Sequence, residues 1–263
     1  MCLIILALEQ HPDWPLLIAA NRDEHHQRPS RAAAPWAENS AVLGGRDEVS
    51  GGSWLACGRG ARWAAVTNDP GVPLPAQAES RGRLVGDYLL NDWTPARWAA
   101  AAFATRHRFA GFHLLAGQGT EVWYTSNRPG NDSAPRRLMP GYHGLANRGL
   151  NSECVKVVGG KRALRRLLQC GPTAAQLLKL LRDERVPPGV YPSERARLVA
   201  PRFIRCPVYG TRASTAVMLG RDGSIALREQ SFDAAAQPLT LRAWSAGAIS
   251  PSTTEEVHWH GHA

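Results

Sequence analysis

Two apolar runs of strand length open the chain, and the four-residue link HPDW joins them. The runs are CLIILALEQ and PLLIAANRDE, and the link contains a proline and an aspartate, which are typical turn residues. This pattern predicts an antiparallel hairpin, in which the start of the first strand lies beside the end of the second. The hairpin therefore brings Cys2 close to the polar stretch Asn21–Glu24.

Further strands are expected on both sides of a helical middle. Strand-like segments are SWLACGRGARWAAVTN, GFHLLAG, EVWYTSN, GYHGLAN and the hairpin STAVMLGRDGSIALREQSF. Helix-like segments are RGRLVGDYLL, TPARWAAAAFATR, TAAQLLKLLRDE and NSECVKVVGGKRALRRLLQ, the last interrupted near Gly159-Gly160. The stretch 28–52, rich in Pro, Gly and Ser, is expected to be a long surface loop. We therefore expect an α+β fold of antiparallel sheets with helices on their outer faces, as one domain, residues 1–263, with a mobile polar tail at 253–263.

Composition limits the class of protein. The chain has 263 residues, 44% of them hydrophobic, and a formal net charge of +9. The basic residues are dispersed and no nucleic-acid-binding motif is present, so no nucleic-acid partner is expected. No apolar run has the length of a transmembrane segment, and no basic segment precedes Leu3–Leu8 as in a signal peptide. The five cysteines are odd in number and form no CxxC pair, so we expect reduced thiols, no metal site and a cytoplasmic protein.

Four polar residues, Asn21, Arg22, Asp23 and Glu24, end the second apolar run. Polar groups at the end of a buried strand are costly unless they are paired or exposed. Two interpretations stay open, because the strand either emerges into water there or lines a cleft with these side chains. In a regular strand Asn21 and Asp23 face one side of the sheet and Arg22 and Glu24 the other, so the four cannot all face Cys2.

Several segments together resemble the NRDE family, which is named for residues 21–24 and includes the transport-and-Golgi-organisation proteins. In chain order these segments are Cys2, AANRDEHHQRPS, GGSWLA, AVTNDPG, GLANRGL and PVYGTRASTAVML. The family is similar in fold to the N-terminal-nucleophile hydrolases of the choloylglycine hydrolase and penicillin V acylase group. The resemblance implies a four-layer αββα sandwich, in which two antiparallel sheets pack face to face between helical layers.

The resemblance also implies that Cys2 is a catalytic nucleophile. Removal of Met1 would give Cys2 both a thiol and a free α-amine. An α-amine and a thiol have ordinary pKa values of about 7.7–8.0 and about 8.5, so proton exchange between them is feasible near neutral pH. By the same resemblance, Asp23 would orient the amine and Arg22 would stabilise the thiolate.

Three more catalytic residues follow from the resemblance. Asn68 and Asn147, each at the end of a strand-like stretch, would donate hydrogen bonds to the oxyanion of a tetrahedral intermediate. Arg212 would lie beside the nucleophile. Without the family pattern, both asparagines read equally well as turn residues and Arg212 as a strand-end surface charge.

A second function of a different class stays open, namely a pocket protein that binds and carries a ligand without chemistry. NRDE proteins have been linked to haem trafficking and to acyl-CoA or lipid handling, so haem is a transported ligand under this alternative, while hydrolysis requires no cofactor. The expected ligand is a small acylated or anionic molecule. Its expected binding residues are Asn21, Glu24, His25 and Trp54. The Arg22–Asp23 spacing differs from that of the related hydrolases and favours binding.

Overall fold

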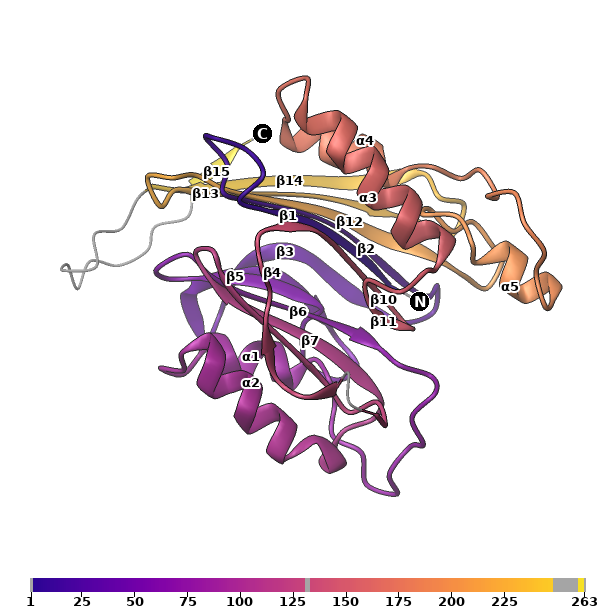
Figure 1. Ribbon diagram of the computed structural model, residues 1–263, viewed down its shortest axis with the longest axis horizontal. Helices are drawn as coiled ribbons and strands as arrows, with labels where there is room; N and C mark the ends of the chain where they lie inside the picture. Colours follow the sequence, from indigo (N-terminus) through magenta and orange to yellow (C-terminus); the bar gives the residue numbers. More distant parts are fainter. Residues whose placement is uncertain (1, 131–132, 248–259, 263) are drawn as a thin grey trace.

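Two antiparallel sheets lie face to face, and helices cover the outer face of each (Figure 1). The computed structural model describes residues 2–130, 133–247 and 260–262. From one side to the other, the layers are α3 with α4, an eight-stranded sheet, a seven-stranded sheet, and α1 with α2. The α+β, four-layer αββα architecture expected from the sequence is therefore confirmed.

The eight-stranded sheet contains both ends of the described chain. Its strand order is β11-β10-β1-β2-β12-β13-β14-β15, and the first hairpin, β1 with β2, forms as expected. The last strand covers part of the segment expected to be a mobile tail, whereas 253–259 lies outside the described residues. The strands are β1 (Leu3–Leu8), β2 (Leu16–His25), β10 (Gly141–Ala146), β11 (Gly149–Leu150), β12 (Tyr209–Leu219), β13 (Ile225–Phe232), β14 (Pro238–Ala246) and β15 (His260–His262).

The seven-stranded sheet has its strands in chain order. They are β3 (Ser30–Trp36), β4 (Asn39–Asp47), β5 (Leu55–Gly58), β6 (Arg62–Asn68), β7 (Phe112–Gln118), β8 (Glu121–Ser126) and β9 (Arg136–Arg137). The expectation of a long surface loop at 28–52 is wrong, because β3 and β4 occupy it. A Cβ on Gly44 would lie 2.6 Å from the Ala56 Cβ, and one on Gly45 would lie 2.2 Å from Trp54 Cζ2. The glycines that suggested a loop are instead required by close packing within the sheet.

Helices form where the sequence places a cap before an apolar stripe. Thr94 Oγ1 accepts a hydrogen bond from the Arg97 N–H at the start of α2, and Thr173 and Gln176 form a capping box on α4. No described helix is long and apolar enough to cross a membrane. The helices are α1 (Arg83–Leu89), α2 (Pro95–Ala104), η1 (Arg106–Arg108), α3 (Val155–Leu168), α4 (Ala174–Leu181) and α5 (Glu194–Leu198).

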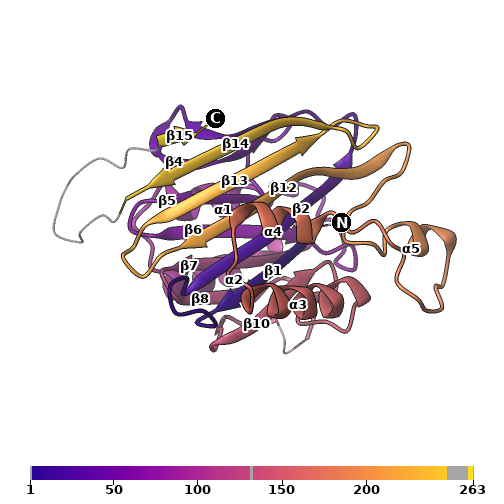
Figure 2. The ribbon, with the colours of Figure 1, turned by 90° about the horizontal axis from the view of Figure 1, so that it is seen from above.

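Helix α3 runs without the interruption expected near Gly159-Gly160. Gly160 is buried against β1, and a Cβ there would lie 1.9 Å from Ile5 Cδ1. The absence of a side chain at Gly160 therefore allows α3 to pack closely against the sheet. Seen from above, α3 lies over β1 and β10, and α4 lies over β2 and β12 (Figure 2).

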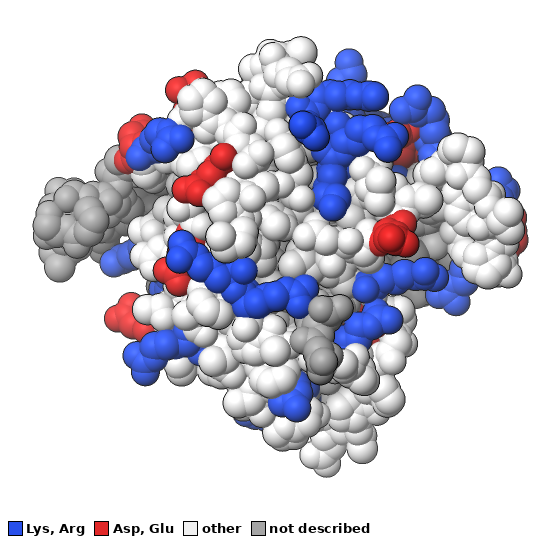
Figure 3. All heavy atoms as spheres, in the orientation of Figure 1, with Lys and Arg blue, Asp and Glu red and all other residues white. Residues whose placement is uncertain are grey.

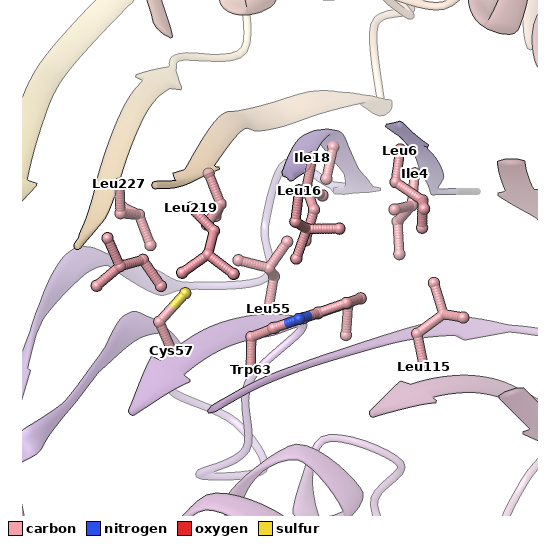
Figure 4. Packing of buried hydrophobic residues seen from close by; sticks show 14 of the residues in the cluster. Ile4, Leu6, Leu16, Ile18, Leu55, Cys57, Trp63, Leu115, Leu219 and Leu227 are labelled. Carbon is pink, nitrogen blue, oxygen red and sulfur yellow. The ribbon is translucent and has the colours of Figure 1, made fainter. Parts of the chain in front are cut away.

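The main core fills the space between the two sheets. Figure 4 shows Ile4 and Leu6 of β1 pointing toward Leu55, Trp63 and Leu115 of the other sheet. The alternate β1 residues, at 3, 5 and 7, pack instead against α3 and α4. Even-numbered residues of β1 thus face the space between the sheets, and this alternation decides which way each candidate site residue points.

Candidate active site

Cys2 lies at the end of the eight-stranded sheet, between two of its expected partners. The first residue of β1 pairs with Asn21 of β2 on one side and with Ala146 of β10 on the other. One residue further out, the antiparallel register places Cys2 between Arg22 and Asn147. The Cys2 side chain is partly exposed. Cys57 is instead buried, and burial raises the pKa of its thiol to about 12.

Arg22 faces the space between the sheets and is 5% exposed. Its Nη2 donates a hydrogen bond to Asp47 Oδ2 at 2.7 Å, and its guanidinium lies 4.7 Å from the centre of the Trp54 ring. Nη1 is buried and makes no hydrogen bond to any residue that the structure describes. Trp54 is part of the core between the sheets and also contacts the site through Arg22.

Asp47, at the end of β4, is a site residue that the sequence reasoning missed. Arg28 Nε donates to its Oδ2 at 2.6 Å, and Arg28 Nη2 donates to its Oδ1 at 3.0 Å. Burial alone would raise the pKa of Asp47, but hydrogen bonds from Arg28 and the Ser50 N–H, with the charges of Arg28 and Arg22, lower it to about 2. Its only sequence signal is an acidic residue in a glycine-rich stretch, GGRDEVSGG.

Asp23 faces the helical layer, on the side of the sheet opposite to Arg22. Thr211 Oγ1 donates to its Oδ1 at 2.7 Å, and Lys156 Nζ lies 3.7 Å from its Oδ2. Burial raises the pKa of Asp23, and the Lys156 charge opposes that shift most strongly. The sequence reasoning missed Lys156. Its signal is spacing, because Lys156 continues the buried i, i+4 stripe of Gly160, Leu164 and Leu168 on α3.

Asn21 also faces the helical layer, away from Cys2. Its Nδ2 donates to the Leu181 and Arg202 carbonyls at 3.2 and 2.7 Å. Its Oδ1 accepts a hydrogen bond from Ser214 Oγ at 2.6 Å. These contacts join the end of α4 to the sheet. The side chain that was expected to bind substrate is engaged in holding the fold.

Asn68 and Asn147 contact each other, although they come from different sheets. Asn147 Nδ2 donates at 2.5 Å to both the backbone oxygen and the side-chain Oδ1 of Asn68. Because Asn147 binds the side-chain oxygen of Asn68, the Asn68 Nδ2 group points away from Asn147. This Nδ2 group donates no hydrogen bond to the described residues. Asn68 thus has the free amide donor, and Asn147 positions it.

Two further arginines belong to this region. Arg212 is the bulged residue of β12, directly before Ala213, which pairs with Arg22, and its Nη1 donates to the His26 carbonyl at 2.7 Å. Burial lowers the pKa of Arg212, and the charge of Arg22 lowers it further. Arg81, which the sequence reasoning missed, precedes α1. Burial lowers its pKa, whereas the electrostatic interaction with Cys2 opposes this shift.

Glu24 and His25 lie at the margin of this site. Glu24 is partly exposed, and its Oε2 lies 3.9 Å from Arg28 Nε. His25 is exposed, and its ring meets the edge of Tyr209 at a centroid distance of 5.3 Å.

Within residues 2–130, 133–247 and 260–262, no group of three His, Cys, Asp or Glu side chains could hold a metal ion. Neither of the two cavities described for the chain is lined by a histidine or a cysteine that could ligate haem iron.

Comparison with known proteins identifies the family. Residues 1–234 match the family described as Transport and Golgi organisation 2. The chain belongs to this family. Transport and Golgi organisation protein 2 homologues from Bos taurus and Homo sapiens are 31% and 30% identical to it over 259 residues, and each alignment covers 88% of this chain and 93% of the relative. The resemblance expected from the sequence is therefore confirmed.

A solved structure supports the fold of this Transport and Golgi organisation 2 family member. An N-acylethanolamine-hydrolyzing acid amidase ortholog from Caenorhabditis elegans superposes with a TM-score of 0.50 at 12% identity, covering 82% of this chain and 92% of that chain. At this identity the likeness shows the fold alone. It establishes an N-terminal-nucleophile hydrolase-like architecture for the chain.

Proposed function

We propose that this protein is an N-terminal cysteine amidohydrolase or acyltransferase that acts on the amide or thioester of a small acylated molecule. One observation carries the proposal, namely that the strand register places Cys2 between Arg22 and Asn147, and that Asn147 in turn holds Asn68. A thiol, a cation and an amide donor are thereby brought to one sheet end. These are the groups that acyl transfer through a thioester requires.

The reaction begins once Met1 has been removed. The α-amine of Cys2 accepts the thiol proton, and the thiolate attacks the acyl carbonyl carbon, so that a C–S bond forms and the carbonyl oxygen becomes negative. The Asn68 amide donates to this oxygen. The intermediate then expels the amine or thiol leaving group, which takes the proton from the Cys2 ammonium. Water or another acceptor cleaves the acyl-enzyme and regenerates the thiol.

Intact mass spectrometry tests the proposal directly. The purified protein should lack Met1 and should gain one acyl group when it is incubated with the p-nitrophenyl ester of a short fatty acid. Cys2→Ala should gain none. Cys170→Ala is the matched control, because Cys170 is the exposed thiol and has no place in the mechanism, so this variant should react like wild type. An adduct that survives in Cys2→Ala would contradict the proposal.

The pairing of Arg22 with Asp47 favours a second candidate function, a carrier of haem or of an acyl-CoA or lipid. A guanidinium engaged by a buried carboxylate gives less support to a thiolate. A carrier would leave Cys2 without an adduct and would bind its ligand equally well as Cys2→Ala. Both functions assume a cytoplasmic protein, in which free thiols stay reduced.

A further inference from the structure

The helical layer formed by α3 and α4 has a strongly basic outer surface. From Cys154 to Arg182, all of whose residues the structure describes, the sequence contains no aspartate or glutamate. It contains seven lysines and arginines, of which Lys156 is buried beside Asp23. Figure 3 shows Lys and Arg side chains gathered over these two helices. The other six, all exposed or partly exposed, are termed the basic face: Lys161, Arg162, Arg165, Arg166, Lys179 and Arg182.

The carboxylates nearest to the basic face in the chain do not neutralise it. Asp183 forms an ion pair with Arg202 at 2.6 Å. Glu184 lies 3.5 Å from Arg205. Glu153 precedes α3 and forms no ion pair with any residue in the described ranges. The six cations of the basic face likewise have no carboxylate of a described residue within ion-pair distance, so their charge is available to a partner.

The stability of α3 accounts for only part of this charge. Arg165 and Arg166 lie in the last turn of the helix, where cations interact favourably with the partial negative charge of its carboxyl end. Lys161 Nζ donates to Asn151 Oδ1 at 3.3 Å. Arg162 lies in the middle of the helix, is exposed, and forms no hydrogen bond with the residues that the structure describes. The contacts of the described chain therefore give the cation at position 162 no role within the fold.

The exposed side of α3 combines cations with small apolar side chains. Val155 and Val158 are 40% and 41% exposed, and Arg162 and Arg165 continue the same stripe at helical spacing. The opposite side of the helix packs on the sheet. Neither of the two cavities described for the chain is lined by a residue of α3. This surface therefore suits a broad, flat partner better than a small ligand in a pocket.

We propose that the basic face docks the protein on the surface of an anionic phospholipid membrane. A basic helix with exposed apolar residues is typical of a surface that lies on a membrane without crossing it. Guanidinium groups bind headgroup phosphates through paired N–H donors, and the contributions of several lysines and arginines add up at an anionic surface. The two valines would contact the boundary between headgroups and acyl chains.

A nucleic acid, the other broad anionic partner, fits the basic face less well. Proteins that bind single strands use aromatic side chains on which the bases stack, and Cys154–Arg182 contains no Phe, Trp, Tyr or His. The sequence also has no motif that reads a duplex. Docking on a membrane depends on the surface of α3 and α4 and not on Cys2, so it stands or fails independently of the proposed function.

Co-sedimentation with lipid vesicles tests the docking. The full chain should bind vesicles of phosphatidylcholine mixed with phosphatidylserine, and it should not bind vesicles of phosphatidylcholine alone. Binding should weaken at high salt, because salt screens the attraction between exposed charges. Cys2→Ala should bind like wild type, which separates the docking from any chemistry at Cys2.

A triple variant, Arg162→Gln/Arg165→Gln/Arg166→Gln, locates the docking surface. It should weaken binding to the mixed vesicles about a hundredfold, since each cation near an anionic surface contributes about fivefold. Arg162→Gln alone should weaken binding about fivefold for the same reason. This single change at an exposed position keeps the test decisive if the triple variant does not fold.

The matched control is Arg59→Gln/Arg97→Gln/Arg106→Gln. It removes the same amount of charge at three exposed arginines in the half of the sandwich that contains the seven-stranded sheet, and it should bind nearly like wild type.

Three results would overturn the docking. Wild-type protein that does not bind the mixed vesicles at low salt has no such surface. Equal weakening by the two triple variants would mean that the vesicles respond to the net charge of the whole protein. A poly(U) RNA or a DNA duplex that displaces the protein from the vesicles at equal phosphate concentration would assign the basic face to a nucleic acid.

Discussion

Asp23 and Lys156 are 3% and 2% exposed, and their charged atoms lie 3.7 Å apart. Neither charge is stable alone at such burial, because desolvation of an isolated ion costs several kcal/mol. The pair matters for the proposed chemistry as well. If Lys156 supplies the positive charge that Asp23 needs, the α-amine of Cys2 can stay neutral and act as a base. Under the proposed mechanism, Lys156 is thus a positioning residue that acts through Asp23.

Lys156→Met should lower the free energy of unfolding by about 3–5 kcal/mol at pH 7, because Asp23 loses a buried counter-charge. Urea unfolding followed by circular dichroism measures the loss. Lys179→Met, on the exposed side of α4, is the control and should change stability by less than about 0.5 kcal/mol. Adding Asp23→Asn to Lys156→Met should restore part of the stability. Equal stability of the two lysine variants would show that the ion pair is unimportant.

The face of the sheet on which a polar residue lies could be predicted from the alternation of residues along the strand. Strand alternation placed Asn21 and Asp23 on one face and Arg22 on the other, as the structure shows. Asp47 and Arg81 could not be found in this way. Their contacts with the site join segments far apart in the chain, and nothing local in the sequence distinguishes them from surface charges.

At the scale of elements, the glycine pair in α3 led to a wrong prediction of a break in the helix. Glycine in a helix interior costs about 1 kcal/mol relative to alanine, so Gly159-Gly160 suggested a break. The structure gives the two residues different surroundings. A Cβ on Gly160 would meet buried Ile5 at 1.9 Å, whereas a Cβ on Gly159 would find Arg202 Nη1 at an ordinary 3.5 Å. Close packing of helix on sheet, which propensity does not describe, explains why the helix continues.

Gly160→Ala should destabilise the protein by about 1–3 kcal/mol, because the added methyl group forces Ile5 or the helix to move. Gly159→Ala, its neighbour, should be neutral or stabilising by up to about 1 kcal/mol, because helix propensity improves without a clash. Thermal unfolding of the two variants side by side gives the comparison. A Gly160→Ala protein as stable as Gly159→Ala would show that α3 does not need this close approach to β1.

At the scale of the whole molecule, the two sheets are joined by polar contacts as well as by the core. Glu229 of the larger sheet accepts hydrogen bonds from the Ala33 N–H of the smaller sheet at 2.7 Å and from Thr215 Oγ1 at 2.8 Å. Trp244 Nε1 donates to the Ala33 carbonyl at 3.1 Å. At the site, Arg22 of the larger sheet meets Asp47 of the smaller one. The layers could be predicted from the family resemblance, but these cross-sheet contacts depend on a register that only the fold defines.

The contacts of Asp47 with Arg28 and Arg22 should make the stability of the fold depend on pH in the acid range. Because the folded pKa of Asp47 is about 2, below the ordinary value of 3.8, its contribution is complete above about pH 4 and is lost as pH falls toward 2. Asp47→Asn should therefore be less stable than wild type by about 2 kcal/mol at pH 7, and this difference should disappear near pH 2. Glu48→Gln, which removes only an exposed pair with Arg31, should cost less than about 1 kcal/mol. Urea unfolding at pH 7, 4 and 2.5 gives the free energy of unfolding of all three proteins. If Asp47→Asn were less stable than wild type by the same amount from pH 7 to 2.5, Asp47 would join the sheets by its shape and not by its charge.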